Sequence, residues 1–146
     1  VRALSLRLGA QALIASLPSR LSTKQQIEFW DPIKRSTRDS WGSLNAIFAE
    51  SLISECILID VQNEGRINGF DAALIANFPF AEVGIIPFGG INQESQVQEL
   101  LSIENVSAVA VGNFLHYQEH AVQKLQKASQ LLRAPRYNKD FSVLPL

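Results

Sequence analysis

Residues 83–92 read Val83-Gly84-Ile85-Ile86-Pro87-Phe88-Gly89-Gly90-Ile91-Asn92, a short apolar run followed directly by two glycines. A short apolar run without regular alternation of polar residues is typical of a strand covered on both faces, as in a parallel sheet. Paired glycines after such a strand let the backbone approach an anion closely, because their N–H groups and the next helix N-terminus can hydrogen-bond phosphate oxygens. The stretch therefore predicts a parallel β/α fold with a candidate phosphate-binding turn.

Three other apolar runs resemble this strand, and segments with helical spacing of apolar residues separate or follow the strands. The predicted strands are 12–17, 56–61, 83–88 and 107–111. The predicted helices are 43–53 with Ser43 as N-cap, 71–78 with Asp71 as cap, a helix after Asn92 as cap, and 119–132. Strict β/α alternation is compatible with an open doubly wound sheet or with a β/α barrel, of which four units are one half.

The polar segment 19–42 interrupts this alternation, with a possible hairpin strand at 27–30 and a turn at Asp31-Pro32. No long Gly, Ser or Pro linker divides the 146 residues, so we expect one domain over residues 1–146. A half barrel would leave two unpaired sheet edges, which favours pairing with another half. We therefore expect either an N-terminal half barrel or a second copy as a partner.

Composition excludes several classes of function. Hydrophobic residues make up 47% and charged residues 18%, which is typical of a globular protein. The formal net charge of −1 gives the whole chain no attraction to nucleic acid or to an anionic membrane, and no apolar run reaches the roughly 20 residues of a membrane span. The single cysteine, Cys56, lies in an apolar run and is predicted to be buried, which is compatible with a reducing, cytoplasmic environment.

A second candidate phosphate-binding turn, Gly112-Asn113, follows the last predicted strand. Loops after successive strands of a parallel β/α fold meet at the same end, so the two glycine turns together strengthen the phosphate-binding interpretation. His116 and His120 have the i, i+4 spacing of helical metal ligands, but no third ligand is evident near them, and we expect surface histidines. We therefore expect no metal and no cofactor.

From Gly9 onward the chain resembles the C-terminal half of the cyclase subunit of imidazole glycerol phosphate synthase. The matching stretches are Gly9–Ala15, Glu55–Leu58, Gly65 with Gly69-Phe70-Asp71 and Leu74-Ile75, Ile85–Gly90, and Ala108–Gly112. The resemblance implies an α/β fold, namely a parallel (βα)4 half of a (βα)8 TIM-type barrel of the ribulose-phosphate-binding type. It also implies a role in histidine biosynthesis, as a lyase that receives ammonia from a partner glutaminase.

The resemblance assigns roles to particular residues. Gly89, Gly90, Gly112 and Asn113 would form one of the family's two phosphate grips. Glu55, at the N-terminal end of its strand, matches a glutamate in the charged ring through which ammonia enters. The ligand would be a phosphorylated small molecule.

Three positions depart from the family pattern. Pro18 stands where a catalytic aspartate is expected, and proline cannot transfer a proton. In the loop after the second strand Gln62 does not titrate, which leaves Glu64 as the candidate catalytic carboxylate. The alternative is therefore a catalytically altered paralogue, which would act as a scaffold or ammonia conduit for a sugar amidotransferase in surface-polysaccharide (lipopolysaccharide) biosynthesis. Cyclase-like proteins of that kind form a separate branch of the family, and the segments Asn113–Lys124 and Arg133–Tyr137 resemble this branch.

Overall fold

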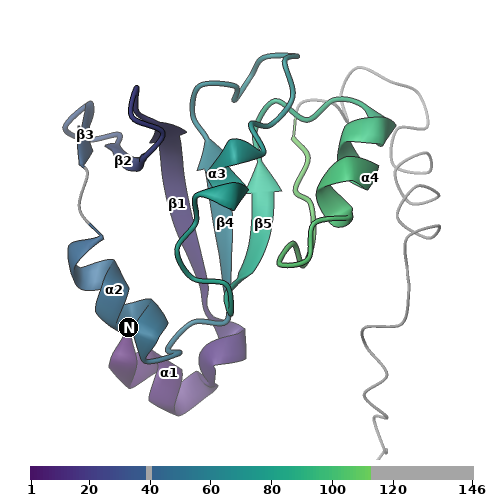
Figure 1. Ribbon diagram of the computed structural model, residues 1–146. Helices are drawn as coiled ribbons and strands as arrows, with labels where there is room; N and C mark the ends of the chain where they lie inside the picture. Colours follow the sequence, from purple (N-terminus) through teal and green to yellow (C-terminus); the bar gives the residue numbers. More distant parts are fainter. Residues whose placement is uncertain (39–40, 113–146) are drawn as a thin grey trace, which may run out of the picture.

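The computed structural model describes residues 1–38 and 41–112, which form one five-stranded sheet with helices (Figure 1). The strands are β1 (Ile14–Leu21), β2 (Ile27–Asp31), β3 (Ser36–Arg38), β4 (Glu55–Asp60) and β5 (Gly84–Phe88). The helices are α1 (Arg2–Leu8), the 3-10 helix η1 (Ala10–Ala12), α2 (Gly42–Ala49), α3 (Ala73–Ala76) and α4 (Glu94–Leu101). The sheet order is β3-β2-β1-β4-β5. The predicted mixed α/β class is confirmed.

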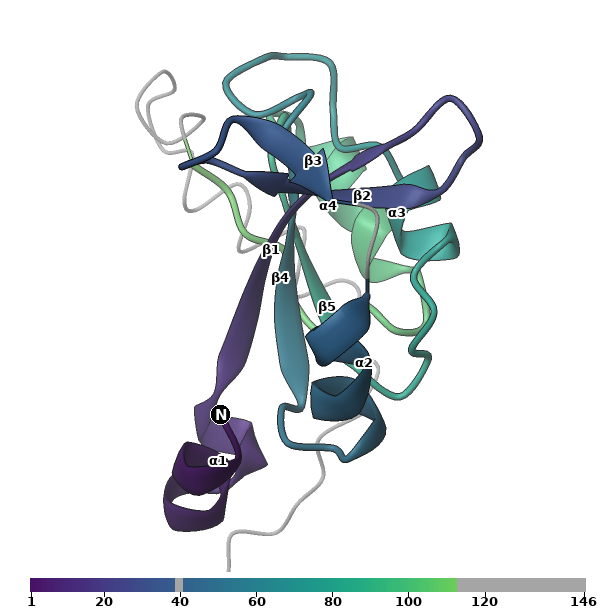
Figure 2. The same cartoon turned by 90° about the vertical axis from the view of Figure 1, so that its left-hand side faces the viewer.

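The parallel part of the sheet comprises β1, β4 and β5, in register from Ile14 beside Glu55 and Gly84 at the amino ends. Burial alternates along these strands. One face, which includes Cys56, Leu58 and Ile85, is fully buried and belongs to a core shared with side chains of α2, α3 and α4. These three helices lie on the same side of the sheet (Figures 1 and 2). The opposite face, which includes Ile57 and Ile86, is half-buried, so only one face has the full cover that the apolar runs predicted.

The predicted fourth strand, 107–111, is not a regular strand. It runs beside β5 through a parallel bridge between Ile85 and Val106 and a hydrogen bond from Ser107 N–H to the Ile85 carbonyl. The next contact is from Ala110 N–H to the carbonyl of Pro87. Pro87 has no N–H to donate, so the regular ladder breaks at this point. The predicted strand 107–111 was wrong because the residue that interrupts its pairing, Pro87, belongs to the neighbouring strand β5.

The polar insertion forms the predicted hairpin, and Figure 2 shows it lying across the carboxyl ends of the parallel strands. β1 continues past Pro18 and pairs with β2 through Ser19, Arg20 and Leu21. The Asp31 carboxylate accepts hydrogen bonds from the N–H groups of Ile33 and Lys34 at 3.0 and 3.1 Å, which forms the predicted turn.

Three predicted helix boundaries need correction. Helix α2 begins at Gly42 after Trp41, so Ser43 is not its N-cap, and the chain leaves the helix where Ser51 adopts a φ of 52°. Helix α3 is shorter than predicted, although Asp71 does accept a hydrogen bond from Ala73 N–H at 3.0 Å. The N-cap of α4 is Gln93 and not Asn92, and Gln93 forms a reciprocal capping box with Gln96. The predicted helix 119–132 lies outside the described residues.

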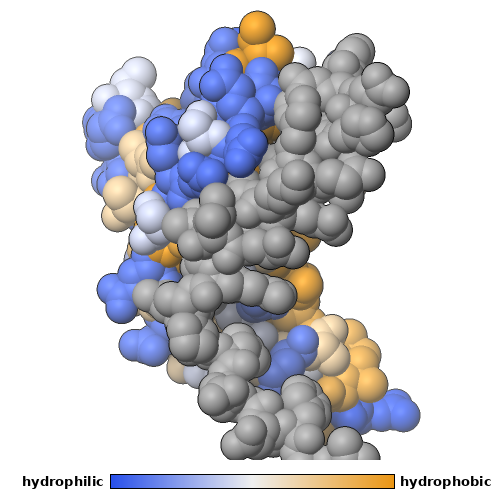
Figure 3. Space-filling model, turned by 90° about the vertical axis from the view of Figure 1, so that its right-hand side faces the viewer, coloured by the Kyte–Doolittle hydropathy of each residue, from blue (hydrophilic) through white to orange (hydrophobic). Residues whose placement is uncertain are grey.

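Helix α1 lies below the amino end of β1 and carries an apolar surface that the described part of the chain leaves open. Figure 3 shows this surface as the orange area at the lower right. Its exposed side chains are Val1, Leu4, Leu6, Leu8 and, at the start of β1, Ile14. Arg2 of α1 forms an ion pair with Glu50, directly after α2. Within the described ranges, no helix is long and apolar enough to cross a membrane.

Candidate functional site

Asp60 organises the carboxyl end of β4. Its side chain is 1% exposed and accepts four hydrogen bonds. Oδ1 accepts the N–H groups of Gln62 and Asn63 at 3.0 and 3.2 Å, and Oδ2 accepts Asn63 Nδ2 at 2.7 Å and Asp71 N–H at 3.0 Å. Hydrogen bonds to an ionised carboxylate are stronger than neutral ones, and they satisfy this buried charge. Asp60 thereby closes the loop from Val61 to Asp71 at both ends.

The Gly89–Gly90 turn packs directly against this loop. Gly89 has a φ of 111°, and a Cβ atom there would lie 2.8 Å from the Asp60 carbonyl oxygen. Gly90 has a φ of 75°, and a Cβ atom there would lie 2.7 Å from the Gly69 carbonyl oxygen. Gly69 N–H in turn donates to the Gly90 carbonyl at 3.1 Å. Both glycines are thus required by the backbone conformation and by the closeness of the neighbouring chain.

The turn presents backbone donors that have no partner. Within residues 1–38 and 41–112, the N–H groups of Gly89, Gly90 and Ile91 donate to no acceptor. The side-chain oxygen Oδ1 of Asn92 is buried and likewise has no partner in this part of the chain, whereas Nδ2 donates to the Ile67 carbonyl at 3.3 Å. Consecutive free N–H groups after a strand can donate hydrogen bonds to the oxygens of a bound anion.

The second predicted glycine turn lies next to the first. A Cβ atom on Gly112 would lie 3.2 Å from the ring of Phe88, the residue that immediately precedes Gly89. The structure therefore brings Gly112 to the same end of the sheet as Gly89 and Gly90. Asn113, the fourth predicted member of this group, lies outside the described residues, as do His116 and His120.

The predicted catalytic position Glu64 is exposed in the loop after β4. Its backbone N–H donates to the Asp60 carbonyl at 2.9 Å. The preceding residue, Asn63, is close to the glycine turn, since its Cβ would lie 2.9 Å from a Cβ on Gly90. Pro18, which occupies the family's aspartate position, lies inside β1 in register with Ile59. It precedes the first residue that pairs with β2.

Glu55 lies at the opposite end of β4 from Asp60, as predicted, and is half-buried. It stands in register with Ile14 and Gly84, and its Cγ would be 3.2 Å from a Cβ on Gly84. The next residue, Cys56, is fully buried as predicted. Burial, with a smaller contribution from the Glu55 carboxylate, raises the pKa of the Cys56 thiol from its ordinary value of 9.0 to about 12.

Asp60 lies within the predicted strand 56–61, but its role at the strand end was not predicted. The available signal was an acidic residue that ends a buried strand and precedes a loop with two glycines, Gly65 and Gly69. Short polar side chains at such positions commonly accept hydrogen bonds from the backbone of the following turn. Within the ranges that the structure describes, no group of three or more His, Cys, Asp or Glu side chains could hold a metal ion.

A partial barrel of parallel strands, with glycine turns gathered at its carboxyl end, agrees with the comparison to known proteins. The family model described as "Histidine biosynthesis protein" matches residues 1–121. This match includes every described strand, the Asp60 loop and both glycine turns. The three parallel strands and their helices are consistent with part of a (βα) TIM-type fold. The chain belongs to the histidine biosynthesis protein family.

Proposed function

We propose that the chain is a cyclase-like subunit of the imidazole glycerol phosphate synthase type, which binds a phosphorylated ligand and uses ammonia from a partner glutaminase. Membership of the histidine biosynthesis protein family supports this proposal at the level of the family. The observation that carries it further is the Gly89–Gly90 turn, which offers unpaired N–H donors where the parallel strands end. That end of a β/α barrel is where ligands bind.

The phosphate would be held by the N–H groups of Gly89 and Gly90, together with Gly112 and Asn113. The close packing of both turn glycines against the Asp60 loop supports this assignment, because a preorganised set of donors does not have to reorder when the anion binds. Glu64 is the candidate acid or base, since it is an exposed carboxylate one residue beyond Asn63.

Ammonia would enter at the other end of the sheet, past Glu55. The position of Glu55 at the amino end of β4 supports a role in that entrance. A second (βα) half, as an N-terminal half barrel or a second copy, would pair with the free edge of β1. This edge has no partner strand from Ile14 to Pro18 among the described residues, and the apolar surface of α1 lies beside it.

Pro18 favours the alternative, a paralogue without cyclase activity that acts as a scaffold or ammonia conduit for a sugar amidotransferase. At this position the side chain cannot exchange a proton, and the strand continues into the hairpin. The alternative retains phosphate binding and ammonia passage and loses only the chemical step.

Amide NMR during titration with inorganic phosphate tests the binding site. We expect saturable shifts at Gly89, Gly90, Ile91 and Gly112. The variant Gly90→Ala should weaken this binding at least tenfold, because the added Cβ would meet the Gly69 carbonyl and move the turn. Gly65→Ala is the matched control, since Gly65 also has a positive φ of 75° but no atom within 4 Å of its Cβ position. Unchanged shifts at the four amides would exclude the phosphate site.

Turnover separates the two functions. The protein is mixed with the cyclase substrate of imidazole glycerol phosphate synthase and with ammonium salt, which replaces the glutaminase. Product that disappears in Glu64→Gln would support the cyclase and identify Glu64 as its carboxylate. Phosphate binding without product, in a preparation with a completed barrel, would support the alternative.

A further inference from the structure

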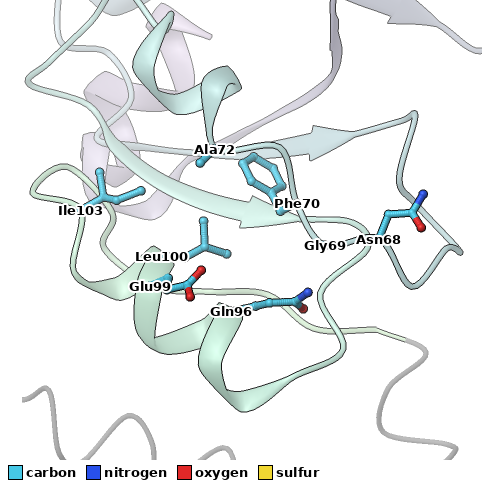
Figure 4. Close-up of a pocket in the computed structure, with 8 residues that line it drawn as sticks. All are labelled: Asn68, Gly69, Phe70, Ala72, Gln96, Glu99, Leu100 and Ile103. Atoms are coloured by element: carbon cyan, nitrogen blue, oxygen red, sulfur yellow. The ribbon is translucent and has the colours of Figure 1, made fainter.

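A hollow of about 210 Å³ lies between the loop 68–72 and helix α4, and neither Gly89 nor Gly90 lines it (Figure 4). Its apolar wall consists of Phe70, Leu100 and Ile103, and its polar groups are Asn68, Gln96 and Glu99. The volume is below the roughly 300–1,000 Å³ of sites for drug-sized ligands. The hollow therefore fits a molecule with a short apolar body.

The only charge in the lining of this hollow is negative. Glu99 is the single ionisable residue in its lining. In the described part of the chain, the Glu99 carboxylate takes part in no ion pair. Figure 4 shows this carboxylate on the same helix as Leu100 and Gln96, between their side chains in that view. An unpaired carboxylate beside an apolar wall is complementary to a cation with a hydrocarbon body.

We propose that this hollow is a second binding site, for a small primary alkylammonium ion. The hydrocarbon body of the ion contacts Phe70, Leu100 and Ile103, and its ammonium group donates to the Glu99 carboxylate. The amide of Gln96 and the side chain of Asn68 supply the polar rim. The site lies between loop and helix and does not use the strand-end donors of the phosphate turn.

The walls of the hollow are connected to the phosphate turn by direct contacts. Gly69 lines the hollow and donates its N–H to the Gly90 carbonyl. Gln96 packs against Gly69, with Nε2 2.8 Å from the position of a Cβ on Gly69. Oε1 of Gln96 accepts the N–H groups of Asn92 and Gln93 at 2.9 and 3.2 Å. An occupant that displaces Gln96 or Gly69 therefore alters the turn from Gly90 to Gln93. An effect of this occupant on phosphate affinity rests on the proposed function. Binding of the occupant to the hollow does not.

The test is amide NMR of the full chain during titration with 3-methylbutylammonium chloride. We expect saturable shifts at residues 68–72 and 96–103, and smaller ones at Gly90 and Asn92. The neutral isostere 3-methylbutan-1-ol should bind at least threefold more weakly, because it cannot pair with Glu99. Sodium chloride at the same concentration controls for ionic strength. Absence of saturable shifts at residues 68–72 and 96–103 would overturn the proposal.

Two variants and a control identify the site. Glu99→Gln should weaken ammonium binding about threefold to fivefold, the range expected for an exposed ion pair, and should leave alcohol binding unchanged. Ala72→Leu places extra volume in the hollow at an exposed position and should abolish binding of both molecules. Glu82→Gln, an exposed carboxylate that does not line the hollow, should bind like the unaltered protein. Equal effects of Glu99→Gln and Glu82→Gln would overturn the role of Glu99.

Phosphate titration of the same samples separates this proposal from the proposed function. If the ammonium ion binds but phosphate produces no shifts at Gly89 and Gly90, the proposed function fails and the second site stands. If phosphate binds and the ammonium ion produces no saturable shifts, the second site fails and the proposed function stands.

Discussion

The strands β1 and β4 are parallel neighbours in the same sheet, but their carboxyl ends are built differently. β4 ends in Asp60, whose buried carboxylate holds the following loop through four hydrogen bonds. β1 passes through Pro18 without turning and extends into an antiparallel hairpin, where Arg20 and Glu28 form a partly exposed ion pair. A buried acceptor at a strand end fixes a loop against its neighbour. In β1, Pro18 is in register with Ile59 and Ser19 with Asp60, so no carboxylate stands at the corresponding place and Pro18 offers neither an N–H nor a side chain that titrates.

The largest effect that this comparison predicts is for Asp60→Ala. Removal of the carboxylate leaves the backbone N–H groups of Gln62, Asn63 and Asp71 without their acceptor, so we expect a loss of about 3 kcal/mol in the free energy of unfolding. Pro18→Ala should change it by less than about 1 kcal/mol, because Pro18 donates no hydrogen bond. Urea denaturation measures both. A larger loss in Pro18→Ala than in Asp60→Ala would reverse the comparison.

The next effect concerns the turn that packs on the Asp60 loop. Gly90→Ala should destabilise the protein by about 2–3 kcal/mol, through left-handed strain and through contact with the Gly69 carbonyl. Gly65→Ala has the same φ of 75° and open space around the Cβ position, so it should cost only about 1 kcal/mol. The difference between the two variants in thermal or urea unfolding isolates the close contact. Equal losses would mean that the loop and the turn are not tightly packed.

The pH dependence of stability at Cys56 reports how completely the amino end of β4 is buried. Its thiol has a pKa of about 12 in the folded protein, above the ordinary value of 9.0, so the folded state keeps the proton that the unfolded chain loses. Stability from this group is therefore full below pH 9.0 and falls between that pH and the folded pKa. At one pH unit above 9.0 we expect a loss of about 1 kcal/mol relative to Cys56→Ala, whose own pH profile lacks this contribution. Parallel profiles for the two proteins would contradict complete burial of the thiol.

Particular residues show how far the sequence could predict this structure. Residues 83–88 and 56–61 were assigned as strands to within a residue, because continuous apolar runs carry that information locally. The strand at 107–111 was wrong, since the broken ladder originates in Pro87 on a different segment. The glycine turn was located from its sequence, but its contact with the Asp60 carbonyl depends on two segments that only the fold brings together. Asp60 was missed for the same reason, because one of its donors, the Asp71 N–H, is eleven residues away.

The smallest predicted effect is at the end of β1. The bond from Arg20 Nε to Glu28 Oε2 is 2.9 Å long, but the Arg20 side chain is 39% exposed, so water screens the pair. A double-mutant cycle with Arg20→Ala and Glu28→Ala should give a coupling energy of about 0.5 kcal/mol, and this coupling should shrink in 0.5 M sodium chloride. The Asp60 bonds should keep their contribution at the same salt concentration, because that carboxylate is buried. A coupling energy at Arg20 and Glu28 that is as large as the Asp60→Ala loss, and insensitive to salt, would mean that the hairpin is held as firmly as the loop after β4. The two strand ends would then differ in sequence but not in rigidity.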